Sequence, residues 1–174
     1  MKFFKLTIVQ MNNILQDYPN HKAFEELLNS CGSMTRQLEN MGHSLTVELI
    51  KEGVIGDYFC RYTILKLDNT PVIFALSHSK LNNHKFINIL KNANNIPIGK
   101  FLFAKDSEII RDRIAISKVF INKVSDIIIK TYLQTNYNHE QVLFSRESEF
   151  ISAENEKMML IEIILPEFKK FFKS

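Results

Sequence analysis

The sequence is poor in the residues that would assign it to a specialised class of protein. Only two of its 174 residues are cysteine, Cys31 and Cys60, and they show neither a CxxC spacing nor a matching pair of histidines. They offer little for zinc, and we interpret them as small buried side chains. No stretch is long and apolar enough to span a membrane, and residues 1–20 lack a signal-peptide pattern. These absences favour a reducing compartment, the cytoplasm or a plastid stroma.

Charge and motif content exclude further classes. The net charge is +3, and the basic residues are interleaved with acidic ones, which gives no support for a nucleic-acid partner. There is no GxSxG, P-loop or GxGxxG motif, so the hydrolase, NTPase and Rossmann interpretations lose their usual support. The histidines are scattered without metal-site spacing, and we expect each on the surface or in a loop: His21, His43, His78, His84 and His139.

Hydrophobic periodicity indicates how the chain is organised. There is no linker, repeat or low-complexity tract, which predicts one domain over residues 1–174. Helical spacing predicts a helix over 21–29 and a second, short one capped by Ser33 or Thr35 and closed by Gly42. Alternation predicts a strand from Leu45 onward. It also predicts an antiparallel hairpin of strands 58–67 and 72–77, joined by a turn at 68–71.

The second half is less uniform. Residues 81–90 have helical spacing, 92–97 form a loop, 107–119 fit a helix or a strand, and 120–137 are ambiguous by period. Two late strands are expected over 142–151 and 158–165. Strands come in hairpin-like pairs rather than alternating with helices. The predicted fold is therefore α+β, a mostly antiparallel sheet with helices on one face.

Two ionisable residues occupy positions where charge is costly. Glu162 lies within MMLIEIILP and Arg61 within DYFCRYTIL, each among apolar neighbours on a predicted strand. Two interpretations stay open. The two side chains could form a structural ion pair or reach the sheet edge. Alternatively, they line the two ends of a pocket for a ligand with a carboxylate at one end and a hydroxyl or ether oxygen at the other.

Two weaker candidates accompany them. The turn Pro97-Ile98-Gly99 is either a plain connection or a place where backbone N–H groups meet an anion. Arg111, beside Asp112 and Arg113, belongs either to a solvated charged face or to a second anion anchor.

At these residues the sequence resembles the chorismate pyruvate-lyases. LLNSCGSMTRQLE with the following TVELIKEG, then FCRYTIL, IPIGKFLF, IIRDRI and LIEIILP resemble five landmarks of that family in the family order, over residues 27–166. The same landmarks occur in an archaeal, cyanobacterial and plastid branch. The resemblance implies an UTRA-like sheet with helices on one face and a closed site that uses no metal or organic cofactor. It also implies removal of pyruvate from chorismate to leave 4-hydroxybenzoate.

Residue by residue, the resemblance implies that Arg61 holds the ring carboxylate with help from backbone N–H groups at Met34 and Ile98. Glu162 would contact the oxygen at the other end of the ring, and Arg61 and Glu162 would be catalytic. Familiar bacterial members carry an arginine near the position of Leu76, and this chain has none there. Arg111 is the replacement that we expect to anchor the second carboxylate.

Two other functions remain open from the sequence. The same fold serves as the effector-sensing domain of transcription regulators, so a non-catalytic sensor or carrier of 4-hydroxybenzoate is the alternative. Only about 30 residues precede the sensor-like part, too few for a winged-helix domain. A lyase that makes another hydroxybenzoate is more distant. Ubiquinone or plastoquinone biosynthesis would use the product, and we expect a monomer or a dimer.

Overall fold

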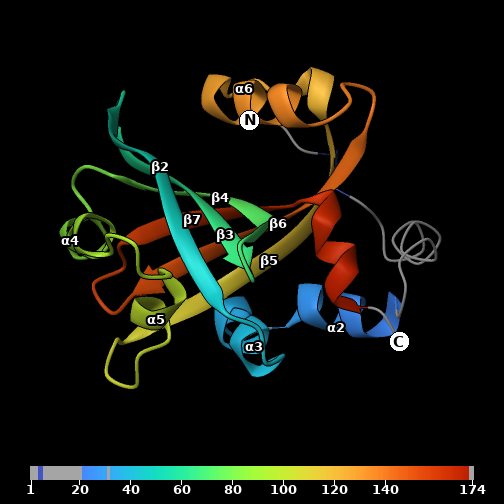
Figure 1. The fold of residues 1–174 in the computed structure, drawn as a ribbon. Coiled ribbons are helices and arrows are strands. Elements are labelled where there is room, and N and C mark those ends of the chain that lie inside the picture. The colour runs from blue at the N-terminus through green and yellow to red at the C-terminus, as the bar shows by residue number, and fades with distance from the viewer. Residues whose placement is uncertain (1–3, 6–20, 31, 173–174) are drawn as a thin grey trace.

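Alternating and β-branched residues place more than a third of the chain in one antiparallel sheet. The computed structural model describes residues 4–5, 21–30 and 32–172. Its strands pair in the order β1-β5-β6-β7-β4-β3-β2, and every neighbouring pair is antiparallel (Figure 1). The strands are β1 Phe4–Lys5, β2 Leu45–Ile55, β3 Tyr58–Leu67, β4 Thr70–Lys80, β5 Ile109–Phe120, β6 Val142–Ser152 and β7 Lys157–Ile164.

Local turn chemistry sets the hairpin at the centre of this sheet. β3 and β4 are joined at Asp68 and Asn69, whose φ angles are 47° and 65°. Two successive residues with positive φ form the turn whose twist matches a two-residue hairpin, and Asp and Asn tolerate it best after glycine. The predicted hairpin and the two late strands are confirmed. Residues 107–119, which fitted either element, form most of β5.

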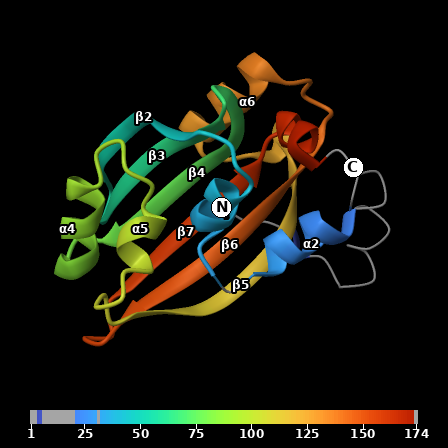
Figure 2. The ribbon, with the colours of Figure 1, turned by 60° about the horizontal axis from the view of Figure 1, so that its bottom comes forward.

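Most of the helices cover one face of the sheet, as Figure 2 shows. The predicted helices over 21–29 and after Ser33 are confirmed, with Ser33 as the N-cap of the second. The apolar side chains Phe24, Leu28, Phe86 and Leu90 pack with strand residues into one core cluster. The elements on this face are α2 His21–Asn29, α3 Met34–Asn40, α4 His84–Asn92, α5 Gly99–Leu102 and the 3-10 helix η2 Pro166–Phe172.

The opposite face carries its own cover. β3, β4 and β7 present large apolar side chains on this side too, among them Ile64, Phe74 and Ile163. They pack against Ile129 and Leu133 of α6 Ile127–Asn136, which follows the 3-10 helix η1 Ile121–Lys123 (Figure 1). The α+β antiparallel architecture is confirmed. The ambiguous region 120–137 supplies the helix that shields the second face, because a sheet apolar on both sides must be covered twice.

Other expectations fare differently. The histidine prediction is wrong for His78, which lies half-buried on β4 with its ring edge-on to Tyr58 at 5.3 Å. Cys60 is a buried free thiol, whereas Cys31 and the N-terminal signal-peptide question lie outside the described residues.

Within the described residues no helix is long and apolar enough to cross a membrane. The same residues contain no group of three His, Cys, Asp or Glu side chains placed to hold a metal ion.

Candidate active site

Strand register brings the side chains of Arg61 and Glu162 onto the same face of the sheet, which forms the floor of the site. Arg61 on β3 lies opposite Ser77 on β4, and Glu162 on β7 lies opposite Ala75 on the other side of β4. The two charged residues are therefore two strands apart, roughly 10 Å across the sheet. At the two positions that pair with these residues, the strand between them carries the small side chains of Ala75 and Ser77. This missing volume leaves a hollow between the two charges.

The hollow is a small, partly enclosed cavity beneath α3 and α5, with an accessible volume of about 20 Å³, room for about one water molecule. All five residues that the sequence singled out for the site lie on its walls. The lining residues are Ser33, Met34, Thr35, Val47, Arg61, Thr63, Leu65, Ala75, Ser77, Pro97, Ile98, Gly99, Phe103, Arg111, Leu160 and Glu162.

Arg61 is a buried cation. Its side chain is 1 % exposed, and its Nη2 donates a hydrogen bond to the backbone carbonyl of Asn94, in the loop after α4. Burial lowers the pKa of Arg61 from its ordinary value, and the charge of Glu52 opposes that effect. An arginine nevertheless stays protonated in proteins. Its Nε makes no hydrogen bond to the described residues, so the guanidinium has donor capacity for an anion in the cavity.

Glu162 does not pair with Arg61. Its Oε2 lies 3.6 Å from Nε of Arg146, its register partner on β6, and both side chains are buried. The interpretation of Glu162 and Arg61 as a mutual ion pair is therefore wrong. Because Arg146 supplies the counter-charge of Glu162 from the side away from Arg61, both Arg61 and Glu162 still face the cavity.

Arg146 is the residue that sequence reasoning missed. It is fully buried, and it is absent from the cavity wall because it stands behind Glu162. The signal was present in VLFSRESEF, where Phe144, Arg146, Ser148 and Phe150 share one strand face. On this face Arg146 is the single charged residue, with a phenylalanine on each side along the strand. A single charge among apolar residues is also the pattern that drew attention to Arg61.

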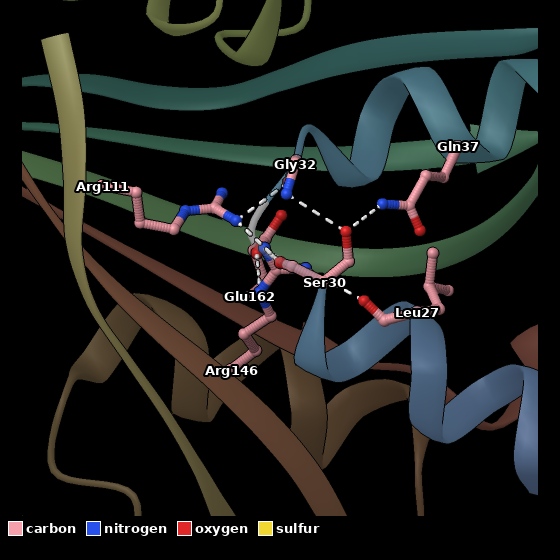
Figure 3. A network of polar contacts seen from close by, with 7 residues as sticks. All are labelled: Leu27, Ser30, Gly32, Gln37, Arg111, Arg146 and Glu162. Carbon is pink, nitrogen blue, oxygen red and sulfur yellow. Dashed lines mark hydrogen bonds and ion pairs between the residues drawn. The ribbon is translucent and has the colours of Figure 1, made fainter.

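Arg111 is held at the rim of the cavity by aromatic rings and carbonyl groups. Its guanidinium carbon lies 4.9 Å from the ring centre of Phe103 and 4.8 Å from that of Phe150. Its Nη1 donates to the carbonyls of Ser30 and Gly32, at 3.2 and 2.9 Å (Figure 3). The solvated-face interpretation is thus wrong for Arg111, although it describes its exposed neighbours Asp112 and Arg113.

Two helix starts form the wall above the floor. Met34 begins α3, and Ile98 is the residue before the first turn of α5. The N–H groups of a first helical turn have no partner within the helix. Ser33 Oγ satisfies one of them by accepting from the N–H of Arg36. Leu76, near which the resemblance led us to look for a second arginine, is remote from this wall because its side chain belongs to the apolar cluster under α6.

Solved structures place this fold in a known class. It is similar to the effector domain of PhnF from Mycobacterium smegmatis, at 11 % identity and a TM-score of 0.57, over 79 % of this chain and 91 % of that one. It is also similar to the C-terminal domain of the histidine utilization repressor from Pseudomonas syringae, at 10 % identity and a TM-score of 0.53, over 71 % and 93 %. At such identities the likeness shows the UTRA-like fold alone.

The sequence itself identifies the family. A family profile described as chorismate lyase matches residues 17–173, so the chain belongs to the chorismate lyase family. The protein named "Putative lyase MJ0807" of Methanocaldococcus jannaschii is 26 % identical over 142 residues, which cover 78 % of this chain and 75 % of that protein. The resemblance drawn from short motifs is thereby confirmed at the level of family and fold.

Proposed function

We propose that the protein is a chorismate lyase that eliminates pyruvate from chorismate and leaves 4-hydroxybenzoate. One observation carries the proposal: Arg61 and Glu162 line the same cavity from either side of Ala75 and Ser77 without neutralising each other. A planar ring with a carboxylate at one end and an oxygen at the other suits that spacing. Family membership supports the reaction class.

In the proposed complex, Arg61 binds the ring carboxylate through its guanidinium. An Arg–carboxylate pair is charge-assisted and can be bidentate, and burial makes it stronger than in water. The backbone N–H groups at Met34 and Ile98 would add donors from the wall above. These contacts fix the ring so that its opposite end points toward Glu162 on β7.

The chemistry itself demands little of the protein. Loss of the proton on C4 and cleavage of the bond between C3 and the ether oxygen make the ring aromatic, and the released enolpyruvate becomes pyruvate. In this proposal Glu162 helps this proton move and contacts the C4 oxygen. Orientation in a closed site supplies much of the remaining acceleration.

Arg111 is the group proposed to hold the second carboxylate, that of the enolpyruvyl arm. It reaches the cavity from β5 and supplies a second positive charge beside Arg61. Because Phe103 and Phe150 flank its guanidinium, the cation is oriented before substrate arrives. Chorismate is a dianion whereas 4-hydroxybenzoate is a monoanion, so two arginines favour substrate over product.

The test is turnover of chorismate by the purified protein, with pyruvate and 4-hydroxybenzoate both quantified. We expect equal amounts of the two products from the unaltered chain. We expect a fall of at least about a hundredfold in kcat/KM in Arg61→Met and Glu162→Gln variants that unfold at the normal temperature. Arg113→Met serves as the control, because Arg113 is exposed on the same strand as Arg111.

Other outcomes decide against the proposal. Tight binding of 4-hydroxybenzoate without release of pyruvate would indicate a sensor or carrier, as would fit the shared fold of the effector domains. Pyruvate with a different hydroxybenzoate would indicate a lyase of other product specificity. If the protein neither binds 4-hydroxybenzoate nor turns over chorismate, the buried charges have a structural role.

A further inference from the structure

Arg146 makes contacts in two directions. Its Nε faces Oε2 of Glu162 at 3.6 Å, while Nη1 and Nη2 donate to the carbonyls of Leu27 and Ser30 at 3.3 and 3.1 Å (Figure 3). Leu27 lies near the end of α2, and Ser30 directly follows that helix. The guanidinium thus joins the carboxylate of the cavity to the chain segment that leads into α3.

The Glu162 contact is an ion pair at a distance longer than a hydrogen bond. Oε2 of Glu162 and Nε of Arg146 make no hydrogen bond within the described part of the chain. Arg146 therefore supplies charge without occupying the acceptor positions of the carboxylate. A buried carboxylate is costly without a nearby cation, and one whose oxygens stay available can accept a hydrogen from a ligand.

The Ser30 carbonyl connects the two sides of the site. It accepts from Nη2 of Arg146 and from Nη1 of Arg111 (Figure 3). The Ser30 side chain in turn accepts from the amide of Gln37 on α3 and from the N–H of Gly32. The same guanidinium that faces Glu162 thereby helps to hold Ser30, which is itself hydrogen-bonded to Gln37 of α3.

We propose that Arg146 is a positioning residue that keeps the carboxylate of Glu162 aimed into the cavity, and that it acts on the substrate only through Glu162. This inference rests on the proposed chorismate lyase function. Arg146 does not line the cavity, so it is not a catalytic residue. Stability gives little reason for the pair, because buried ion pairs can be replaced by apolar residues of similar size without loss.

A double-mutant cycle separates positioning from structure. The variants are Arg146→Met, Glu162→Gln and the combination, with kcat and KM for chorismate measured for each. We expect Arg146→Met to lower kcat at least about tenfold while KM changes less than about threefold. In the Glu162→Gln background, Arg146→Met should produce no further loss beyond about twofold. Arg146→Lys, which keeps the charge, should recover part of kcat.

A matched control comes from the same hairpin. Lys157→Met removes a partly exposed cross-strand ion pair with Glu149, 3.5 Å apart, and should leave kcat and KM unchanged. If Arg146→Met alone does not fold, the combined variant, which leaves no buried charge uncompensated at this pair, is compared with Glu162→Gln.

The outcomes distinguish the two claims. Additive losses of kcat, or an Arg146→Met effect confined to KM, would overturn the positioning role while leaving the lyase function intact. If the unaltered protein binds 4-hydroxybenzoate without turnover, the lyase function is wrong. The same variants are then compared by their affinity for 4-hydroxybenzoate, and additive losses of affinity again overturn the positioning role. Absence of both turnover and binding overturns both.

Discussion

Gly99 lies so close to Ser33 that a Cβ on Gly99 would stand 2.8 Å from Ser33 Oγ and 3.0 Å from Thr35 Oγ1. Ser33 is not free to turn away without cost, because its hydroxyl caps α3 by accepting from the N–H of Arg36. The close approach of α5 to α3 therefore depends on glycine, and this contact closes the wall above Arg61 and Glu162.

We predict that Gly99→Ala separates the two helix starts. The free energy of unfolding should fall by about 1–3 kcal/mol, as expected for overpacking with partial loss of a cap. Affinity for 4-hydroxybenzoate should fall as well. Gly32→Ala is the control, because a Cβ there meets its nearest atom at an ordinary 3.5 Å. Denaturant unfolding and ligand titration of both variants provide the check, and equal effects would contradict the prediction.

The hollow between the two charges depends on the small side chain of Ala75. We predict that Ala75→Val, which adds two methyl groups to the cavity floor, lowers 4-hydroxybenzoate affinity at least about tenfold. Valine suits a strand, and overpacking by two methyl groups typically costs about 1–3 kcal/mol, so the free energy of unfolding should fall by no more than about 3 kcal/mol. Calorimetric titration and denaturant unfolding measure the two effects. Unchanged affinity in a folded variant would show that the ligand does not use this space.

His78 gives the protein a predictable response to pH. Burial is the main cause that lowers the pKa of His78 below its ordinary value of 6.5. The unfolded chain therefore takes up the proton first, and stability falls as pH decreases from 6.5 toward the folded-state pKa. We predict that His78→Gln loses less stability than the unaltered chain between pH 7.5 and 5.5. Denaturant unfolding at both pH values tests this, and identical losses would contradict it.

Much of the fold followed from the sequence because its signals were local. The positive-φ turn at Asp68 and Asn69, the Ser33 cap and the alternation around Glu162 each depend on a few neighbouring residues. Residues 120–137 resisted prediction because α6 is specified by the apolar second face of a sheet formed by distant strands. The hydrophobic periodicity within residues 120–137 does not indicate that requirement.

The site residues likewise include some that the sequence indicated and some that it did not. Arg61 and Glu162 were conspicuous as isolated charges among apolar residues. Ile98 and Arg111 were weaker candidates from the sequence, and Met34 followed from the family motifs alone. The sequence did not reveal the partner of Glu162, because the pairing with Arg146 depends on the register of β6 against β7. That register cannot be derived from the local sequence. The role of Ala75 was equally hidden, since a small residue becomes informative only when its cross-strand neighbours are known.

The most direct test of the central claim asks whether one ring is held with its carboxylate at Arg61 and its oxygen at Glu162. Affinities for 4-hydroxybenzoate, 4-hydroxybenzamide and benzoate are measured for the unaltered chain and for folded Arg61→Met and Glu162→Met variants. Arg61→Met should abolish the preference for carboxylate over amide, and Glu162→Met the preference for the ring hydroxyl, each worth about tenfold or more. Equal weakening of all three ligands by both variants, or the reverse assignment of preferences, would contradict the account.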